Sequence, residues 1–284
     1  VKDAGREVPF TPLDGTLPSL DNPDLTIHNH AKVVHIIDRL DKGITLRELG
    51  GHTIGILGGM GPVATLDLYG LLISSIRWDK AITEARHIVI NNIPVPNLFQ
   101  QPDGFIRGYL AEQTRLLETA GAKVIGVCCN SAHHFFASMR QALSDEVVLV
   151  DLIQEVCLST EKNGFRRPGV FSSTMARPLY EQRCKSLGLN PVMLDSAGQG
   201  KVDQAISRIL YGERGPELLH ELDALAADSA SRGADCVILG CTDLPLVMTS
   251  DTCPLPLISS TAVLASALAR FSGDPVTVNG GIVA

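Results

Sequence analysis

The stretch Val124-Ile-Gly-Val-Cys-Cys-Asn-Ser-Ala-His133 is an apolar segment that runs directly into a cysteine and then into small polar residues. The stretch Cys236-Val-Ile-Leu-Gly-Cys-Thr-Asp243 repeats this order, with Cys241 standing 112 residues after Cys129. A Gly-Ala pair precedes each stretch at the same offset. Each copy therefore predicts the end of a helix, a turn, a buried strand and a cysteine at the end of that strand.

A second pair of segments supports an internal duplication. Gly55-Ile-Leu-Gly-Gly59 aligns with Gly169-Val-Phe-Ser-Ser173 at nearly the same offset, and each precedes its cysteine strand in the chain. Strands that recur in the same order and almost in phase indicate a repeated unit. Because ligands bind at the carboxyl ends of parallel strands, we expect the two cysteines to face each other across one cleft.

The composition is that of a globular protein with a sizeable core. Of the 284 residues, 45% are hydrophobic and 19% are charged, and the net charge of −7 argues against a nucleic-acid or membrane partner. No stretch has the roughly 18 apolar residues of a membrane-spanning helix, and no signal-peptide pattern opens the chain. The seven cysteines are odd in number and lie in apolar segments, which predicts a reducing cytoplasm. Three of them, Cys157, Cys184 and Cys253, are interpreted as small buried side chains.

Strands that alternate with helices predict an α/β fold with parallel sheets. We expect strands at residues 53–57, 87–90, 124–127 and 147–150 in a first half, and near residue 169 and at 191–194, 236–240 and 256–258 in a second. Helices are expected from Pro62 and at residues 105–120, 177–187, 202–211, 216–232 and 262–271, the last packing back onto the first half. The two half-domains would comprise residues 52–164 plus 259–284 and residues 165–258.

Residues 1–51 have a different character. Residues 1–31 carry four prolines among Asp, Asn and Gly without sustained periodicity, which is typical of an extended N-terminal arm. Residues 32–42 place Val33, Val34, Ile36, Ile37 and Leu40 on one helical stripe, which Gly43 ends. We interpret this second segment as a docking helix that precedes the main fold.

The loop Gly58-Gly-Met-Gly-Pro62 leads into a helix, with Pro62 at the first helical position. Free amide groups of such a loop can hold a carboxylate or a phosphate. A dinucleotide site is disfavoured, because the P-loop and Gly-x-Gly-x-x-Gly patterns are absent and Asn91-Asn92 stand where an acidic ribose ligand is expected. The histidines and cysteines also lack the spacing of a zinc site, so no metal is expected.

A thiol at the end of a buried strand, beside the amide dipoles of a following helix, is expected to have a lowered pKa. Cys129 with His133, one helical turn later, would suit a covalent hydrolase. Two such thiols, Cys129 and Cys241, on opposite faces of a planar carbanion can instead remove a proton from one side and return one from the other. The plainer alternative is that both are inert core residues of a duplicated fold, and Cys128 is assigned to packing.

Three motifs, Gly55-Ile-Leu-Gly-Gly-Met-Gly-Pro62, Cys129-Asn-Ser-Ala-His133 and Gly240-Cys-Thr-Asp243, resemble those of the aspartate/glutamate racemase family. The match is to its aspartate-racemase branch, with Gly-Gly-Met-Gly-Pro, Cys-Asn-Thr-Ala-His and Gly-Cys-Thr-Glu motifs, and covers roughly residues 52 to 270. The resemblance implies a cofactor-independent, PLP-independent amino-acid racemase with two pseudo-symmetric α/β half-domains. It further implies that Cys129 and Cys241 are the catalytic acid and base and that the protein is a homodimer.

The resemblance also implies that five residues bind the amino-acid substrate, namely Met60, Asn130, Ser131, Thr174 and Thr242. Ser, Thr and Asn at these places are also typical helix caps, so capping is the alternative for Asn130, Ser131 and Thr242. His133 is interpreted as a structural helix residue and Asp243 as a residue that orients its surroundings.

The sequence differs from the aspartate racemases at the residues that, in that family, bind the side-chain carboxylate of the substrate. Leu98 stands where the family has an Arg, Asp203 falls near the family's Lys with Lys201 two residues away, and Asp243 replaces a Glu. We treat these four as specificity positions and expect a substrate other than aspartate or glutamate. In the alternative, an acidic substrate is retained and Arg177 or Lys201 supplies the charge. Rival functions are a cysteine-dependent isomerase or decarboxylase of the maleate, hydantoin or malonate type, and a catalytically silent ligand binder.

Overall fold

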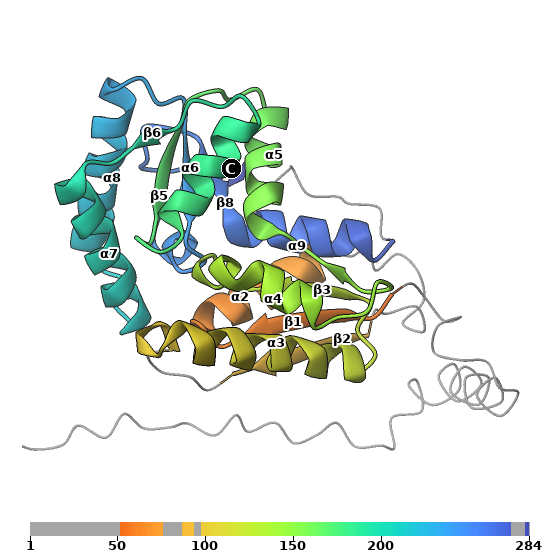
Figure 1. Ribbon diagram of the computed structural model, residues 1–284. Coiled ribbons are helices and arrows are strands. Elements are labelled where there is room, and N and C mark those ends of the chain that lie inside the picture. Colours follow the sequence, from red (N-terminus) through yellow and green to blue (C-terminus); the bar gives the residue numbers. More distant parts are fainter. Residues whose placement is uncertain (1–51, 76–86, 94–97, 274–281, 284) are drawn as a thin grey trace, which may run out of the picture. The chain divides into compact units, whose positions relative to one another are not determined.

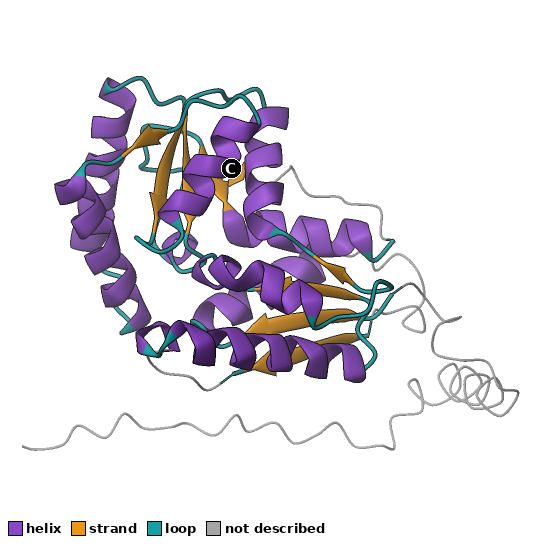
Figure 2. Cartoon of the chain, in the orientation of Figure 1, coloured by secondary structure: helices purple, strands orange, loops and turns teal. Residues whose placement is uncertain are grey.

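The computed structural model describes residues 52–75, 87–93, 98–273 and 282–283 (Figure 1). The N-terminal arm and the docking helix expected within residues 1–51 lie outside the described residues. Helices and strands alternate along the described chain and form two separate sheets, each covered by helices (Figure 2). The predicted α/β fold class is therefore confirmed.

The first sheet has the strand order β2-β1-β3-β4, and all its neighbours are parallel. These strands are β1 (Ile54–Gly58), β2 (Ile88–Asn92), β3 (Val124–Val127) and β4 (Val148–Leu149). Every residue of β1 and β3 is buried, as expected for strands that helices cover on both faces. The carboxyl ends of β1 and β3 lie side by side, because Leu57 pairs with Val127.

The second sheet repeats this order as β6-β5-β7-β8, again with parallel neighbours. The strands are β5 (Pro168–Ser172), β6 (Val192–Met193), β7 (Cys236–Gly240) and β8 (Leu257–Ser259). β5 therefore corresponds to β1 and β7 to β3, which is the duplication that the sequence indicates. One addition differs: β9 (Ile282–Val283) pairs antiparallel with β8. Assigning residues 259–284 to the first half is therefore wrong for β9, which extends the edge of the second sheet.

Within the described residues, nine helices and short turns connect the strands of the two sheets. In the first half these are α2 (Pro62–Ser75), η3 (Leu98–Gln100), α3 (Asp103–Thr119), η4 (Ser131–Phe135) and α4 (Phe136–Gln141). In the second they are α6 (Arg177–Ser186), α7 (Ser196–Leu210), α8 (Pro216–Ser231) and η5 (Leu244–Leu246). α7 begins six residues earlier than expected, because Asp195 caps it by accepting a hydrogen bond from the Gly198 amide at 2.7 Å.

Two further helices join the halves. α5 (Leu152–Lys162) was not predicted, although Asp151 caps its first turn by accepting from the Gln154 amide. α9 (Ser260–Phe271) leaves the second sheet and packs against α2, α5 and β3, as expected for a helix that closes onto the first half (Figure 1). Gly126 of β3 makes room for it, since a side chain there would lie 3.0 Å from Leu268. One hydrophobic cluster consequently contains residues of both sheets and of α9.

Candidate active site

The structure brings the two cysteine segments into contact. Cys129 follows β3 and precedes η4, and Cys241 follows β7 and precedes η5. The Thr242 hydroxyl donates a hydrogen bond to the carbonyl oxygen of Cys128 at 3.5 Å, which links the segments directly. The electric field of Cys129 also contributes to the raised pKa of Cys241. The strand ends of two half-domains thus place two thiols in one region.

Cys129 is 6% exposed, and this burial dominates its chemistry. Burial raises the pKa of the Cys129 thiol to about 12, while the backbone amides of Ala132 and Ser131 lower it and the charge of Asp243 raises it. The expected stabilisation of a thiolate by helix-start amides is therefore present. Desolvation outweighs this stabilisation, however, and the expectation of a lowered pKa is wrong.

Cys241 also holds its proton firmly. Burial raises the pKa of Cys241 well above its ordinary value, and the negative charge of Asp243 adds to this effect. The Cys241 thiol points its Sγ at Oδ2 of Asp243, at 3.7 Å, as a hydrogen-bond donor. Cys129 faces amide donors and Cys241 faces a carboxylate, so their environments favour a thiolate at Cys129 and a thiol at Cys241. Titratable groups whose surroundings separate their proton affinities in this way are typical acid and base partners.

Asp243 connects the second cysteine segment to the loop after β1. Its side chain is 3% exposed, and burial raises its pKa to about 6, against the lowering effects of the Cys241 hydrogen bond and of Arg214. A Cβ on Gly61 would lie 2.6 Å from Oδ1 of Asp243, so a side chain there would displace the Asp243 carboxylate. Gly59 is held with φ +94° and donates its amide to the Thr65 hydroxyl at 3.0 Å. Met60, between them, packs on the hydrophobic cluster that contains Cys129.

Arg214 is a cation near this site that sequence reasoning missed. It lies in the turn between α7 and α8, where its Nη1 donates to the carbonyl oxygens of Ile209 and Glu213 at 2.6 and 2.7 Å. From there its charge lowers the pKa of Asp243. Leu210, the last residue of α7, approaches Gly61, since a Cβ on that glycine would lie 3.0 Å from Leu210 Cδ2. No motif marks Arg214, because only packing brings this turn to the loop.

The predicted ligand-binding residues Asn130 and Ser131 bond to other protein groups. Asn130 is buried, its Nδ2 donates to Ser260 Oγ at 3.1 Å, and its Oδ1 accepts from the Tyr180 hydroxyl at 2.6 Å. One N–H of its amide remains for a ligand. The Ser131 hydroxyl lies 2.7 Å from Ser173 Oγ in the other half. Asn130 makes no capping hydrogen bond, so it joins the halves and does not act as a helix cap.

Thr174 and Asp203 form a pair. Asp203 accepts hydrogen bonds from the Thr174 amide at 2.9 Å and from its hydroxyl at 2.5 Å. The Thr174 hydroxyl is thus already engaged. Arg177 donates to Gln199 at 3.2 Å and to the Leu194 carbonyl at 2.8 Å, and Lys201 is exposed on α7. Leu98 is the first residue of η3, and its side chain lies outside the part of the chain that the structure describes.

His133 is a structural residue, as the sequence analysis indicated. Its Nε2 accepts from the Leu152 amide at 3.1 Å, so its Nδ1 carries the hydrogen and donates to the Cys129 carbonyl at 2.9 Å. Burial lowers the pKa of His133, which keeps the ring neutral. Both ring nitrogens are hydrogen-bonded to main-chain groups, and neither is hydrogen-bonded to the Cys129 thiol. This geometry disfavours the Cys–His hydrolase alternative.

The remaining cysteines contribute to packing. Cys128 is fully buried and its Sγ lies 3.5 Å from the Ala64 carbonyl oxygen. Cys157 and Cys184 are also fully buried, with their sulfur atoms 3.5 Å apart between α5 and α6. Among the described residues, no group of three His, Cys, Asp or Glu side chains could hold a metal ion. In the same part of the chain, no helix is both long enough and apolar enough to cross a membrane.

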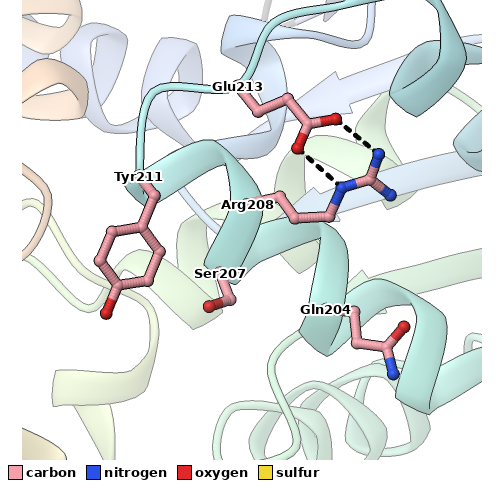
Figure 3. Close-up of a pocket in the computed structure, with 5 residues that line it drawn as sticks. All are labelled: Gln204, Ser207, Arg208, Tyr211 and Glu213. Carbon is pink, nitrogen blue, oxygen red and sulfur yellow. Dashed lines mark hydrogen bonds and ion pairs between the residues drawn. The ribbon is translucent and has the colours of Figure 1, made fainter. Parts of the chain in front are cut away.

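A surface pocket lies on α7 and the turn that follows it (Figure 3), and none of its lining residues belongs to the cysteine segments. Its volume is about 430 Å³, and its lining residues are Gln204, Ser207, Arg208, Tyr211 and Glu213. The Arg208 guanidinium is already bound by Glu213, at 2.9 and 2.5 Å, and by Glu221 at 2.7 Å. Ligand chemistry is therefore better supported at the cysteines than at this pocket.

Most of the chain is similar to known proteins. A family model described as Asp/Glu/Hydantoin racemase matches residues 57–268. The broad specificity amino-acid racemase RacX of Bacillus subtilis (strain 168) is 25% identical over 222 residues, which cover 75% of this chain and 94% of that protein.

Two solved structures have a similar fold. The aspartate racemase of Picrophilus torridus has a TM-score of 0.68 at 23% identity, covering 80% of this chain and 96% of its own. An aspartate racemase homologue from Pyrococcus horikoshii OT3 has a TM-score of 0.66 at 24% identity, covering 78% of this chain and all of its own. At these identities the two structures support the fold alone.

Proposed function

Because this chain belongs to the Asp/Glu/Hydantoin racemase family, we propose that it is a PLP-independent amino-acid racemase in which Cys129 and Cys241 serve opposite faces of the substrate Cα. Such an enzyme is an isomerase. The observation that carries the proposal is the paired strand ends, which bring one thiol beside amide donors and the other beside a carboxylate. An inert duplicated core would not require a buried, ionisable Asp243 next to the second thiol.

In the proposed mechanism the two thiols exchange roles. The Cys129 thiolate removes the α-proton from one face, and the Cys241 thiol gives its proton to the opposite face of the planar carbanion. Cys129 then carries the proton and Cys241 is the thiolate, which is the starting state for the reverse direction. Both thiols have raised pKa values without ligand, so the thiolate must be stabilised in the complex, and the substrate ammonium group is a cation that can do so.

We propose a substrate other than aspartate or glutamate, or several amino acids. Leu98 removes a guanidinium that would form a strong charge-assisted pair with a side-chain carboxylate. Asp203 adds a negative charge beside the loop that carries Ser173 and Thr174. The broad specificity of the relative RacX agrees with this proposal. For the acidic alternative, Arg214, whose charge acts on Asp243, is a further source of charge beside Arg177 and Lys201.

Roles for the other residues follow from their places. We propose that the substrate is surrounded by Met60, Asn130, Ser131, Thr174 and Thr242. Substrate specificity is proposed to depend on Lys201, Asp203 and Asp243. Thr174 would act through its hydrogen bonds to Asp203. No cofactor or metal is proposed.

A homodimer in the cytoplasm is proposed on two observations. All seven cysteines are free thiols, which suits a reducing compartment. Helix α2 exposes Val63, Leu66 and Tyr69 to 49, 70 and 38%, an apolar stripe that suits association with a second copy.

The test is a panel of L- and D-amino acids incubated in deuterated water, read by loss of the α-proton and by chiral chromatography. We expect the wild-type protein to exchange and invert several amino acids. Cys129→Ser and Cys241→Ser should each abolish inversion, whereas Cys253→Ser should not, because Cys253 lies outside both cysteine motifs. A single active-site variant with near-normal two-way inversion would refute the two-thiol scheme.

The same panel separates the rival functions. A clear preference for aspartate or glutamate would overturn the substrate proposal. Release of carbon dioxide from a malonate would indicate a decarboxylase, and absence of exchange with every compound would indicate a ligand binder. Light scattering of the purified chain, with Leu66→Glu as the disrupting variant, tests the dimer.

A further inference from the structure

Tyr180 of α6 contacts both cysteine segments at once. Its side chain is fully buried, and its hydroxyl donates to Oδ1 of Asn130, the residue after Cys129, at 2.6 Å. Its ring lies against Gly240, the residue before Cys241, because a Cβ on that glycine would be 2.6 Å from Cε2 of Tyr180. One rigid aromatic side chain therefore lies between the two strand ends that carry the thiols.

The hydrogen bond between Tyr180 and Asn130 affects the surroundings of Cys129. The Asn130 amide is bonded on two sides, to Tyr180 through Oδ1 and to Ser260 through Nδ2 at 3.1 Å. The next two residues, Ser131 and Ala132, supply the backbone amides that lower the pKa of Cys129. Because Asn130 is 2% exposed, losing the Tyr180 hydroxyl leaves a buried oxygen without its partner. Reorientation of this amide would displace the donors that face Cys129.

The contact between the Tyr180 ring and Gly240 affects the position of Cys241. A residue with any side chain at position 240 would also crowd Ser172, whose Cβ would be 2.9 Å away. The absence of a side chain lets the Tyr180 ring reach the main chain immediately before Cys241. The charge of Cys241 contributes to the raised pKa of Tyr180, in agreement with this proximity.

We propose that Tyr180 is a positioning residue that fixes the separation and orientation of the two thiols. The inference rests on the proposed racemase function. A two-base reaction needs both thiols within reach of the same Cα at the same time, and rates depend steeply on such alignment. Tyr180 touches no reacting atom and acts through Asn130 on one side and Gly240 on the other.

The test is Tyr180→Phe, which removes the hydroxyl and keeps the ring. We expect kcat for racemisation to fall about tenfold in both directions, with KM changed less than about threefold, because a loss of alignment acts on the chemical step. Tyr211→Phe is the matched control, since Tyr211 is 88% exposed and should leave kcat unchanged. An unchanged kcat in Tyr180→Phe, on a folded protein, overturns the proposal.

A double-mutant cycle separates positioning from general loosening of the core. If Tyr180 acts through the Asn130 amide, Tyr180→Phe combined with Asn130→Ala should lose little more activity than Asn130→Ala alone. Independent, multiplying losses would refute that route. The rate of alkylation by iodoacetamide, followed by mass spectrometry, should change at Cys129 but not at Cys253; equal changes at both would indicate mere loosening.

Two outcomes keep this proposal distinct from the proposed function. A wild-type protein without α-proton exchange refutes the racemase, whereas an active wild type with an unaffected Tyr180→Phe refutes only the role of Tyr180. Should Tyr180→Phe fail to fold, Ser260→Ala releases the Asn130 amide from its other side. A fall in kcat with unchanged KM is then expected, and wild-type kcat in Ser260→Ala overturns the proposal.

Discussion

Replacement of Asp243 by Asn should stabilise the protein at neutral pH while lowering its activity. Asp243 is buried, and burial raises its pKa from the ordinary 3.8 to about 6. The native state therefore prefers the protonated carboxyl. The stability that this preference contributes is fully present below pH 3.8 and is lost as the pH rises through about 6. An asparagine never ionises, so the variant avoids that loss.

The magnitude follows from the two pKa values. Their difference corresponds to about 3 kcal/mol of unfolding free energy once the pH is well above 6. The advantage of Asp243→Asn over the wild type should therefore approach about 3 kcal/mol at pH 8 and be about 1.5 kcal/mol at pH 5. An ionised, buried carboxylate lowers the stability of the fold, and such a cost is typical of a functional residue. We propose that the function of Asp243 is to accept the hydrogen bond of the Cys241 thiol.

Urea unfolding of both proteins at pH 5 and pH 8 measures the effect, with the racemase assay on the same samples. Asp145→Asn is the control, because the Asp145 side chain is fully exposed and its ion pair with Arg140, at 3.4 Å, should contribute little to stability. Equal pH dependence of the unfolding free energy in wild type and Asp243→Asn would refute the reasoning. Wild-type racemisation in the variant would refute the role of Asp243 beside the thiol.

Three further predictions concern the surroundings of the thiols. His133→Ala should lower the unfolding free energy by about 2–4 kcal/mol, because it leaves the buried Leu152 amide and the Cys129 carbonyl without their partners. The same variant should reduce racemisation less than tenfold. Unchanged stability with complete loss of activity would instead make His133 the catalytic base. Gly61→Ala should lower activity at least tenfold by displacing Asp243, whereas Gly70→Ala within α2, with open space around it, should stabilise by about 0.5–1 kcal/mol. Equal effects of the two variants on activity would contradict the contact between Gly61 and Asp243. Exhaustive chelation should leave racemisation intact, and loss that one added metal restores would contradict a thiol-only mechanism.

Several parts of the site could not be read from local patterns. Helix α5 escaped prediction because it follows β4 directly, without the Gly or Pro that usually marks a boundary. The lowered thiol pKa was expected from helix-start amides, which are present, but desolvation depends on what covers Cys129 from elsewhere in the chain. Arg214 has no motif, and only the packing of the α7–α8 turn against Gly61 brings its charge near Asp243.

The sequence by itself determined the duplicated order of strand, small residues and cysteine, the parallel α/β class and the family. These features are local, because hydrophobic periodicity and turn residues act within one segment of the chain. In a parallel sheet the carboxyl ends of the strands lie at the same edge, so the position of the cysteines follows from the strand order. The tertiary structure alone decided that Asn130 is bonded to Tyr180 and Ser260, 50 and 130 residues away, and that Thr174 is bonded to Asp203. Such partners are set by how two half-domains and α9 pack together, and a buried polar side chain must satisfy its hydrogen bonds with whatever that packing brings within reach.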